Sequence, residues 1–304
     1  MLKYESIGEL VREAEKRGVK ISELVLADQA EAMEATEIEL YEKMEIDFFV
    51  MVSSVQTGGE KDQRSMSGLT GGEGWKMKAY AEKNDGGLCG PFLAKAIARA
   101  LAVAGCNASM GRIVAAPTAG SCGILPGCLV SLWEDQGFHQ KDIVMSMFTA
   151  GAVGMVIASR ASIAGAQGGC QAECGSAAAM AAAALVELMG GTPSQCADAV
   201  AIAIANQLGL VCDPVAGLVE IPCIKRNVSG LVIAFSSADL ALAGIEAKIP
   251  ADECLDAMRS VGDSMSSALK ETAKGGLADT PTGVRLQKQV FGDARGEDII
   301  LNSI

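Results

Sequence analysis

Ten cysteines carry the clearest potential for chemistry in this 304-residue chain. No two of them have the Cys-x-x-Cys spacing that is typical of zinc ribbons and bacterial ferredoxins. The amino-terminal residues are acidic where a signal peptide needs an apolar stretch, so we expect a cytoplasmic location. In a reducing compartment, thiols serve as small buried side chains or as metal ligands more often than as disulfides. The ten cysteines therefore indicate packing or metal binding.

Three segments combine a cysteine with small or polar residues and lack an amphipathic pattern: 168–175, 210–217 and 220–227. Cys170 stands at the start of an Ala-rich stretch, where the amino terminus of a helix favours a thiolate. Cys212 follows a helix stop at Gly209, and Cys223 follows a proline. These three thiols are thus predicted at element ends, where distant ligands can converge. Spacing alone leaves packing open as the alternative.

Four other cysteines lie within or beside apolar helical stretches, which suits packing: Cys106, Cys128, Cys196 and Cys254.

Two further segments are rich in glycine and hydroxyl groups. Residues 57–74 contain Ser67, Thr70 and Gly71, and residues 107–123 contain Thr118 and Ser121. Backbone of this kind can approach a ligand closely and offer N–H groups to an anion. Neither segment fits the dinucleotide-binding or P-loop patterns, and a surface loop is the alternative interpretation.

The elements that position these segments are predicted to be helices. Ser6 and Thr36 are helix caps, and Thr192-Pro-Ser-Gln195 is a strong helix start. Val/Ile runs bounded by turns are scarce, and no alternation of strands with helices is evident. We therefore expect a mostly α, single compact multi-helix domain with Gly-rich active-site loops. Residues 1–56 would form an amphipathic N-terminal layer, and residues 57–304 the core that binds ligands. Helices are predicted at 7–17, 36–55, 91–104, 143–159, 176–189, 193–209, 228–247 and 251–273.

Composition excludes several classes of function. The net charge of −12 and the pI near 4.7 lack the basic footprint of a nucleic-acid binder, so we expect no nucleic acid partner. Residues 143–159 are uncharged but shorter than the roughly 20 residues of a membrane span, and Asp142 and Arg160 bound them. We therefore interpret this stretch as a buried helix and expect no membrane association.

Five segments resemble the α chain of iron–sulfur-dependent L-serine dehydratases, and the similarity covers nearly the whole chain. The long block from Cys212 to Asn227 is the most specific. The segments are Ser67–Gly72, Ala116–Ser121, Gly168–Glu173, Cys212–Asn227 and Gly275–Ala278.

This resemblance implies a lyase that converts L-serine to pyruvate and ammonia with a [4Fe–4S] cluster. It places the cluster ligands at Cys170, Cys212 and Cys223 and leaves the other seven cysteines as structural. Three thiolates leave one iron free to act as a Lewis acid on the substrate hydroxyl. Some single-chain relatives end in a cysteine, whereas this chain ends Leu301-Asn302-Ser303-Ile304, so the fourth iron position is expected to be open.

The substrate carboxylate must be held while a base removes the α-proton. Hydroxyls and backbone N–H groups of the two Gly-rich loops are candidates for this: Ser67, Thr70 and Gly71 in one, Thr118 and Ser121 in the other. Arg226 and Asn227 adjoin a ligand cysteine and are expected to contact substrate or tune the cluster. The alternative for Arg226 is an ion pair with a carboxylate.

The catalytic base is unknown at this stage. His139 is predicted to be a solvated loop residue, and Lys78, Tyr80 and Lys225 have no supporting pattern. The resemblance implies a separate β chain that completes the site, in an oligomer. Two alternatives stay open: a cysteine desulfidase-type lyase, and a non-catalytic helical scaffold subunit.

Overall fold

Three helices begin at capping residues that the sequence analysis identified. The Ser6 hydroxyl accepts a hydrogen bond from the Glu9 backbone N–H, and Thr36 and Thr192 each form a reciprocal capping box. The computed structural model describes residues 4–292, and its elements agree with all three caps. The mostly α, single-domain prediction is confirmed, since the described residues contain helices and one isolated β-bridge but no strand.

The α-helices follow one another along the chain, with short 3₁₀ turns and one π-helical turn, Gln171–Gly175, between them. They are α1 (Ile7–Arg17), α2 (Ile21–Ala32), α3 (Glu37–Gly58), α4 (Glu73–Lys83), α5 (Gly90–Ala108), α6 (Ile124–Gln136), α7 (Gln140–Arg160), α8 (Gly165–Gly168), α9 (Ser176–Leu188), α10 (Pro193–Ala205), α11 (Cys223–Leu242), α12 (Ala251–Ser264) and α13 (Pro281–Phe291).

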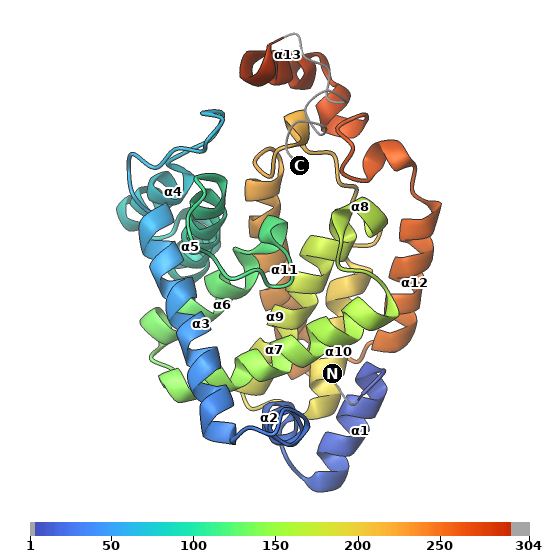
Figure 1. Cartoon of the computed structure of the whole chain (residues 1–304). Coiled ribbons are helices and arrows are strands. Elements are labelled where there is room, and N and C mark those ends of the chain that lie inside the picture. The colour runs from blue at the N-terminus through green and yellow to red at the C-terminus, as the bar shows by residue number, and fades with distance from the viewer. Residues whose placement is uncertain (1–3, 293–304) are drawn as a thin grey trace.

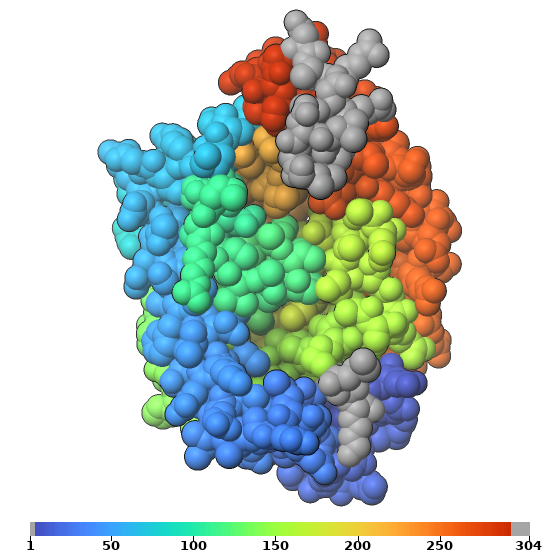
Figure 2. Space-filling model, viewed as in Figure 1, coloured from blue at the N-terminus to red at the C-terminus, as the bar shows by residue number. Residues whose placement is uncertain are grey.

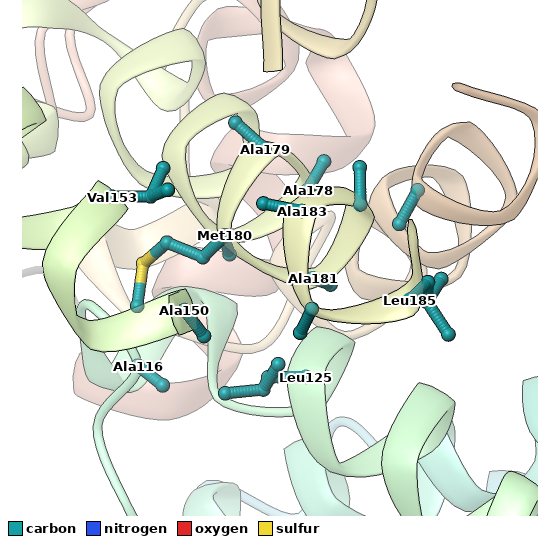
Figure 3. Packing of buried hydrophobic residues seen from close by; sticks show 14 of the residues in the cluster. Ala116, Leu125, Ala150, Val153, Ala178, Ala179, Met180, Ala181, Ala183 and Leu185 are labelled. Atoms are coloured by element: carbon teal, nitrogen blue, oxygen red, sulfur yellow. The ribbon is translucent and has the colours of Figure 1, made fainter. Parts of the chain in front are cut away.

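Helix α9 is the centre of the bundle and packs against α6, α7, α10 and α11 (Figure 1). Every residue from Ser176 to Glu187 is buried, and most of them are alanines. Small side chains let neighbouring helices approach closely, so the core is filled by backbone contact rather than by aromatic rings. Met180 is an exception that fits beside Gly154 of α7, where a Cβ would lie 2.9 Å from its sulfur (Figure 3).

The amino-terminal helices wrap this core with amphipathic faces. Helix α1 buries Ile7, Leu10, Val11 and Ala14, and α3 buries Phe48 and packs on α5, α6 and α7. The separation of residues 1–56 as a layer stays a prediction.

Several boundaries differ from the sequence-based expectation. Helices α2, α4, α6, α8 and α13 were not predicted, and α3 continues through Gly58 into the expected loop. Helix α11 begins at Cys223 rather than at residue 228. Helix α12 ends at Ser264 rather than at residue 273, because the following segment turns back to hydrogen-bond with Cys212.

Within residues 4–292, two stretches are long and apolar enough to cross a membrane by length and composition, Gly87–Ala108 and Gln140–Arg160. The most apolar window is 50% buried in the first and 67% buried in the second. Helix α7 packs against α9, α2 and α3, so its apolar composition is explained by its place inside the bundle.

Candidate metal centre

Two of the three predicted ligand cysteines meet in the structure. The sulfurs of Cys170 and Cys212 and a carboxylate oxygen of Glu173 all lie within 4.8 Å of one another. Both thiols are 2% exposed, and the Glu173 Oε2 atom lies 3.9 Å from Cys170 Sγ and 3.8 Å from Cys212 Sγ. Residues from separate parts of the chain thus form a compact, buried set of sulfur and oxygen donors, which could hold a metal ion.

Cys170 is positioned by its neighbours on both sides. Gly169 adopts φ +75°, and a Cβ there would lie 2.7 Å from the Met265 sulfur, so only glycine fits. The buried Gln171 side chain donates to the Met258 carbonyl at 2.8 Å and accepts from the Gly209 N–H at 2.8 Å. A π-helical turn follows directly, which is a feature that occurs frequently at functional sites.

Cys212 is held by the segment that follows α12. Its N–H donates to the Leu269 carbonyl, and its carbonyl accepts from the Glu271 N–H, each at 2.8 Å. These bonds form the isolated parallel bridge between Cys212 and Lys270. The position of the thiol therefore depends on a segment almost 60 residues further along the chain.

Arg226 joins the two cysteine segments. Its guanidinium donates to Cys170 Sγ at 3.5 Å and to the Val211 carbonyl at 2.7 Å, and it pairs with Asp213 at 2.8 Å. Asp213 also accepts from the Leu277 N–H at 2.7 Å. Arg226 thus forms the ion pair with a carboxylate that was the alternative interpretation. The same side chain also contacts a predicted ligand thiol.

Asp213 also lies against Gly276, a glycine of the Gly275–Ala278 motif. Gly276 adopts φ +62°, and a Cβ at that position would lie 2.3 Å from the Asp213 Oδ2 atom. A side chain here would push the carboxylate away, so glycine is required for both conformation and space.

Cys223 is the first residue of α11 and is 5% exposed. It is not one of the three donors that lie within 4.8 Å of one another, but the charges of Cys170 and Glu173 act on its pKa. The Asn227 amide donates to the carbonyls of Cys223 and Gly120, each at 2.9 Å, and its oxygen accepts from the Gly123 N–H at 2.8 Å. Asn227 thus holds the 118–123 loop against the start of α11, and its predicted contact with substrate stays a prediction.

Among the thiols of the site, Cys170 is the one whose deprotonated form is favoured. Hydrogen bonds from the thiols of Cys174 and Cys212, and then the Arg226 guanidinium, hold the pKa of Cys170 well below its usual range despite burial. The hydrogen bond to Cys170, together with burial, raises the pKa of Cys212 and of Cys174. Burial, and next the charge of Cys170, raises the pKa of Cys223, and the same two causes raise the pKa of Glu173 to about 7.

Two of the other seven cysteines differ from the rest in their setting, and the structural role expected for all seven stays a prediction. Cys174 is buried four residues after Cys170, and its thiol lowers the pKa of Cys170. Cys89 is exposed at the start of α5 and does not pack in the core. The remaining five are buried, in line with packing: Cys106, Cys122, Cys128, Cys196 and Cys254.

The first predicted substrate loop is tied to a carboxylate. Ser67 Oγ donates to Glu220 Oε2 at 2.8 Å, and Thr70 Oγ1 donates to the same oxygen at 2.9 Å. Gly71 is fixed by space, because a Cβ on it would lie 2.4 Å from the Gln63 carbonyl. The loop is therefore attached to the segment that leads into Cys223.

The second predicted loop is attached in the same way. Thr118 Oγ1 donates to Glu173 Oε1 at 2.9 Å and lies 3.2 Å from the hydroxyl of the buried Ser121. In Figure 2 the surface is hollowed where the green segment near residue 115 meets the yellow-green segment near residue 160. The roles of all five loop residues in substrate binding stay predictions.

The four side chains considered as bases are all exposed, whereas the thiol group is buried. His139 is exposed in the connection between α6 and α7, as expected for a solvated loop residue. Lys78, Tyr80 and Lys225 are exposed as well. The carboxyl-terminal residues 301–304, on which the expectation of an open iron position was based, lie outside the described residues.

Two carboxylates of the site were missed by the sequence analysis. Glu173 and Glu220 lie inside the recognised motifs, three residues after Cys170 and three before Cys223. An acidic residue three positions from a candidate ligand cysteine was the available signal. It could not show that hydroxyls from two distant loops would converge on these acids.

Comparisons with known proteins identify the family of this chain. The family described as serine dehydratase alpha chain matches residues 16–278. The chain is 47% identical to the probable L-serine dehydratase alpha chain of Bacillus subtilis, covering 96% of this chain and 97% of the relative. It is also 47% identical to the L-serine dehydratase alpha chain of Peptoniphilus asaccharolyticus, covering 92% and 96%.

A longer relative contains the same region. The L-serine dehydratase of Streptomyces coelicolor is 38% identical over 89% of this chain, which corresponds to 59% of that protein. The matched family region contains all three predicted ligand cysteines and both Gly-rich loops. The chain therefore belongs to the serine dehydratase alpha chain family.

Proposed function

We propose that this chain is the α subunit of an L-serine dehydratase that converts L-serine to pyruvate and ammonia with a [4Fe–4S] cluster held by Cys170, Cys212 and Cys223. The observation that carries the proposal is the meeting of Cys170, Glu173 and Cys212 in one buried donor group. Family membership supplies the reaction, and the donor group supplies a place for its cofactor.

The residues present fit an iron–sulfur cluster in the chemistry of their donors. Cluster iron is bound by cysteine thiolates. Two cysteines of the site begin helical segments, where the helix dipole favours the thiolate, and Arg226 supplies a positive charge beside Cys170. Binding of the cluster would release the protons that the raised pKa values keep on Cys212 and Cys223.

When bound, the cluster supplies a Lewis-acidic iron to polarise the substrate hydroxyl. The protein positions the residues of the site and keeps water away from them. Arg226 fixes Cys170 relative to Val211 and Asp213, and the Asn227 amide fixes the 118–123 loop relative to Cys223. These hydrogen bonds keep the site in a single arrangement before substrate enters, which lowers the entropic cost of reaction.

A separate β chain is proposed to complete the enzyme, in an oligomer in the cytoplasm. The relatives of matching length are named alpha chains, and the longer Streptomyces coelicolor relative contains additional residues beyond the shared region. The histidine and the lysines named above are exposed, whereas the thiol group is buried. We therefore propose that the β chain contributes to proton transfer.

The proposal is tested by iron and acid-labile sulfide content after anaerobic reconstitution, together with pyruvate formation from L-serine with and without the β chain. We expect about four irons and four sulfides per chain, as the cluster formula requires, and activity that depends on the β chain. L-cysteine as a parallel substrate distinguishes dehydration from desulfuration. Absence of bound iron would instead favour the scaffold alternative.

Single substitutions identify the ligands. Cys212→Ala should abolish iron binding while the far-ultraviolet circular dichroism of the helical fold is retained. Cys196→Ala is the matched control, because that thiol is equally buried and donates to the Ala183 carbonyl instead of joining the donor group. Retention of iron in the first variant and its loss in the second would contradict the ligand assignment.

A further inference from the structure

The buried donor group contains a carboxylate that the three-cysteine assignment does not use. Glu173 is 9% exposed, and its Oε2 atom lies 3.9 Å from Cys170 Sγ and 3.8 Å from Cys212 Sγ. Cys223, the third predicted cluster ligand, is not one of these three donors. The ligands of a four-iron cluster bind different irons and are spread around it, whereas these donors all lie within 4.8 Å of one another. Their arrangement is therefore suited to one ion.

The separations between the donors are close to those around a single tetrahedral ion. With zinc–sulfur bonds of about 2.3 Å and zinc–oxygen bonds of about 2.1 Å, a sulfur and an oxygen on the same ion lie about 3.6 Å apart. The two sulfur–oxygen distances at Glu173 exceed this separation by only about 0.2–0.3 Å. A small movement of the side chains would therefore bring all three donors onto one ion.

The two oxygens of the Glu173 carboxylate have different partners. Oε1 accepts a hydrogen bond from Thr118 Oγ1 at 2.9 Å, and Oε2 is the atom that lies beside both sulfurs. Arg226 in turn donates to Cys170 Sγ at 3.5 Å. Hydrogen bonds to the ligands of a metal orient them and are part of such sites. The donor group thus has both the ligand atoms and the contacts that hold them in place.

Two glycines leave the space that Glu173 occupies. A Cβ at Gly165 would lie 2.8 Å from Glu173 Oε2 and 3.1 Å from Cys212 Sγ, and a Cβ at Gly120 would lie 3.0 Å from Glu173 Oε1. Side chains at these positions would push the carboxylate away from the thiols, because the interior is closely packed. The local sequence therefore allows an oxygen and two sulfurs to meet.

We propose that the cluster-free chain binds one zinc or ferrous ion through Cys170, Glu173 and Cys212, with the fourth position left for water. Two thiolates and one carboxylate suit such ions, whereas magnesium and calcium prefer oxygen ligands. Binding of the ion releases the protons of the two thiols. The inference goes beyond the proposed function, because this site uses Glu173 in place of Cys223 and needs no sulfide.

Cobalt(II) and zinc are the probes, because cobalt(II) takes the place of zinc and its absorption spectrum reports the coordination geometry. The metal-free full-length chain is titrated anaerobically with cobalt(II), and competition with zinc gives the dissociation constant. Cys89→Ser is present throughout, so that this exposed thiol cannot capture the ion. We expect one ion per chain, a thiolate-to-cobalt charge-transfer band and the visible bands of a tetrahedral ion.

Two substitutions separate this site from the cluster site. Glu173→Gln should weaken zinc binding by more than about 100-fold, because the loss of a ligand exceeds the effect of losing an outer partner, about 10–100-fold. Cys223→Ala should leave the zinc dissociation constant and the charge-transfer band unchanged. Glu187→Gln is the matched control, since Glu187 is 4% exposed and also accepts from a threonine, Thr149 Oγ1, at 2.8 Å. It should bind zinc like the parent chain.

Unchanged zinc binding in Glu173→Gln, or its loss in Cys223→Ala, would overturn the inference, as would the absence of stoichiometric binding in the parent chain. If Glu173→Gln does not fold, Thr118→Val removes the hydroxyl that holds Oε1 and should weaken zinc binding about 10–100-fold. Unchanged binding there would be equally fatal. A chain that binds one cobalt ion but never acquires iron and sulfide would refute the proposed function alone, and the opposite result would refute this inference alone.

Discussion

Replacing Asp213 with alanine tests whether one buried ion pair holds the candidate metal centre together. The Asp213 side chain is 4% exposed and its partner Arg226 is 15% exposed. Removing the carboxylate leaves the guanidinium buried without its counterion and the Leu277 N–H without its acceptor. Loss of one member of a buried pair costs about 3–5 kcal/mol, and the orphaned N–H adds about 1–3 kcal/mol.

The remaining contacts of Arg226 with Cys170 and Val211 can persist. We therefore expect the free energy of unfolding to fall by about 3–5 kcal/mol, near the lower end of the sum of these two costs. For a protein of this size, roughly 2–4 °C per kcal/mol gives a fall in Tm of about 6–20 °C. Differential scanning calorimetry and urea unfolding, both under anaerobic conditions, measure the two quantities. Asp213→Asn keeps one acceptor oxygen and the side-chain volume, and should lose less.

The matched control is another arginine–aspartate pair. Arg160 and Asp256 are joined by two hydrogen bonds of 2.8 Å, but their side chains are 31% and 55% exposed. Solvent screening limits such a pair to under about 1 kcal/mol, so Asp256→Ala should barely change Tm. Equal destabilisation by the two alanine variants would refute the reasoning, because burial is the main difference between the pairs.

Three further outcomes follow from individual residues. Gly276→Ala should lower Tm well beyond Gly244→Ala: both glycines have positive φ, but only the first faces a side-chain oxygen, at 2.3 Å from its added Cβ, and similar losses would contradict this. Brief iodoacetamide treatment of the apoprotein should label the exposed Cys89 first, which peptide mass spectrometry would show, and earlier labelling of a buried thiol would be inconsistent with the fold. Burial raises the pKa of Asp135, but the hydrogen bonds and charges of Arg99 and Lys95 together outweigh it and lower that pKa, so the stabilisation is present at neutral pH and lost as pH falls below about 4. The difference in unfolding free energy between wild type and Asp135→Asn should therefore shrink on acidification, and a pH-independent difference would argue against the pair.

Local patterns predicted the helices whose signals are local. Ser6, Thr36 and Thr192 are caps whose hydrogen bonds reach only three residues, so sequence spacing is enough to identify them. The boundary at Ser264 could not be read this way. The chain leaves α12 because the backbone around Leu269 and Glu271 pairs with Cys212, and that partner is distant in sequence.

The cysteine motifs show the same division within the site. Residue types and the family resemblance singled out Cys170, Cys212 and Cys223, and the structure brings the first two into one donor group. The convergence of hydroxyls on Glu173 and Glu220 was invisible, because each contact joins residues at least 55 positions apart.

The sequence by itself determined that this chain is helical, which thiols have the setting of ligands, and which family it belongs to, since these depend on periodicity, neighbours and motif order. Tertiary structure alone decided which polar groups face one another: Arg226 with Asp213, Thr118 with Glu173, and Ser67 with Glu220. Electrostatic and hydrogen-bond energies fall steeply with distance in space, whatever the separation along the chain. The arrangement of polar groups at the candidate site is therefore set by contacts that only folding creates.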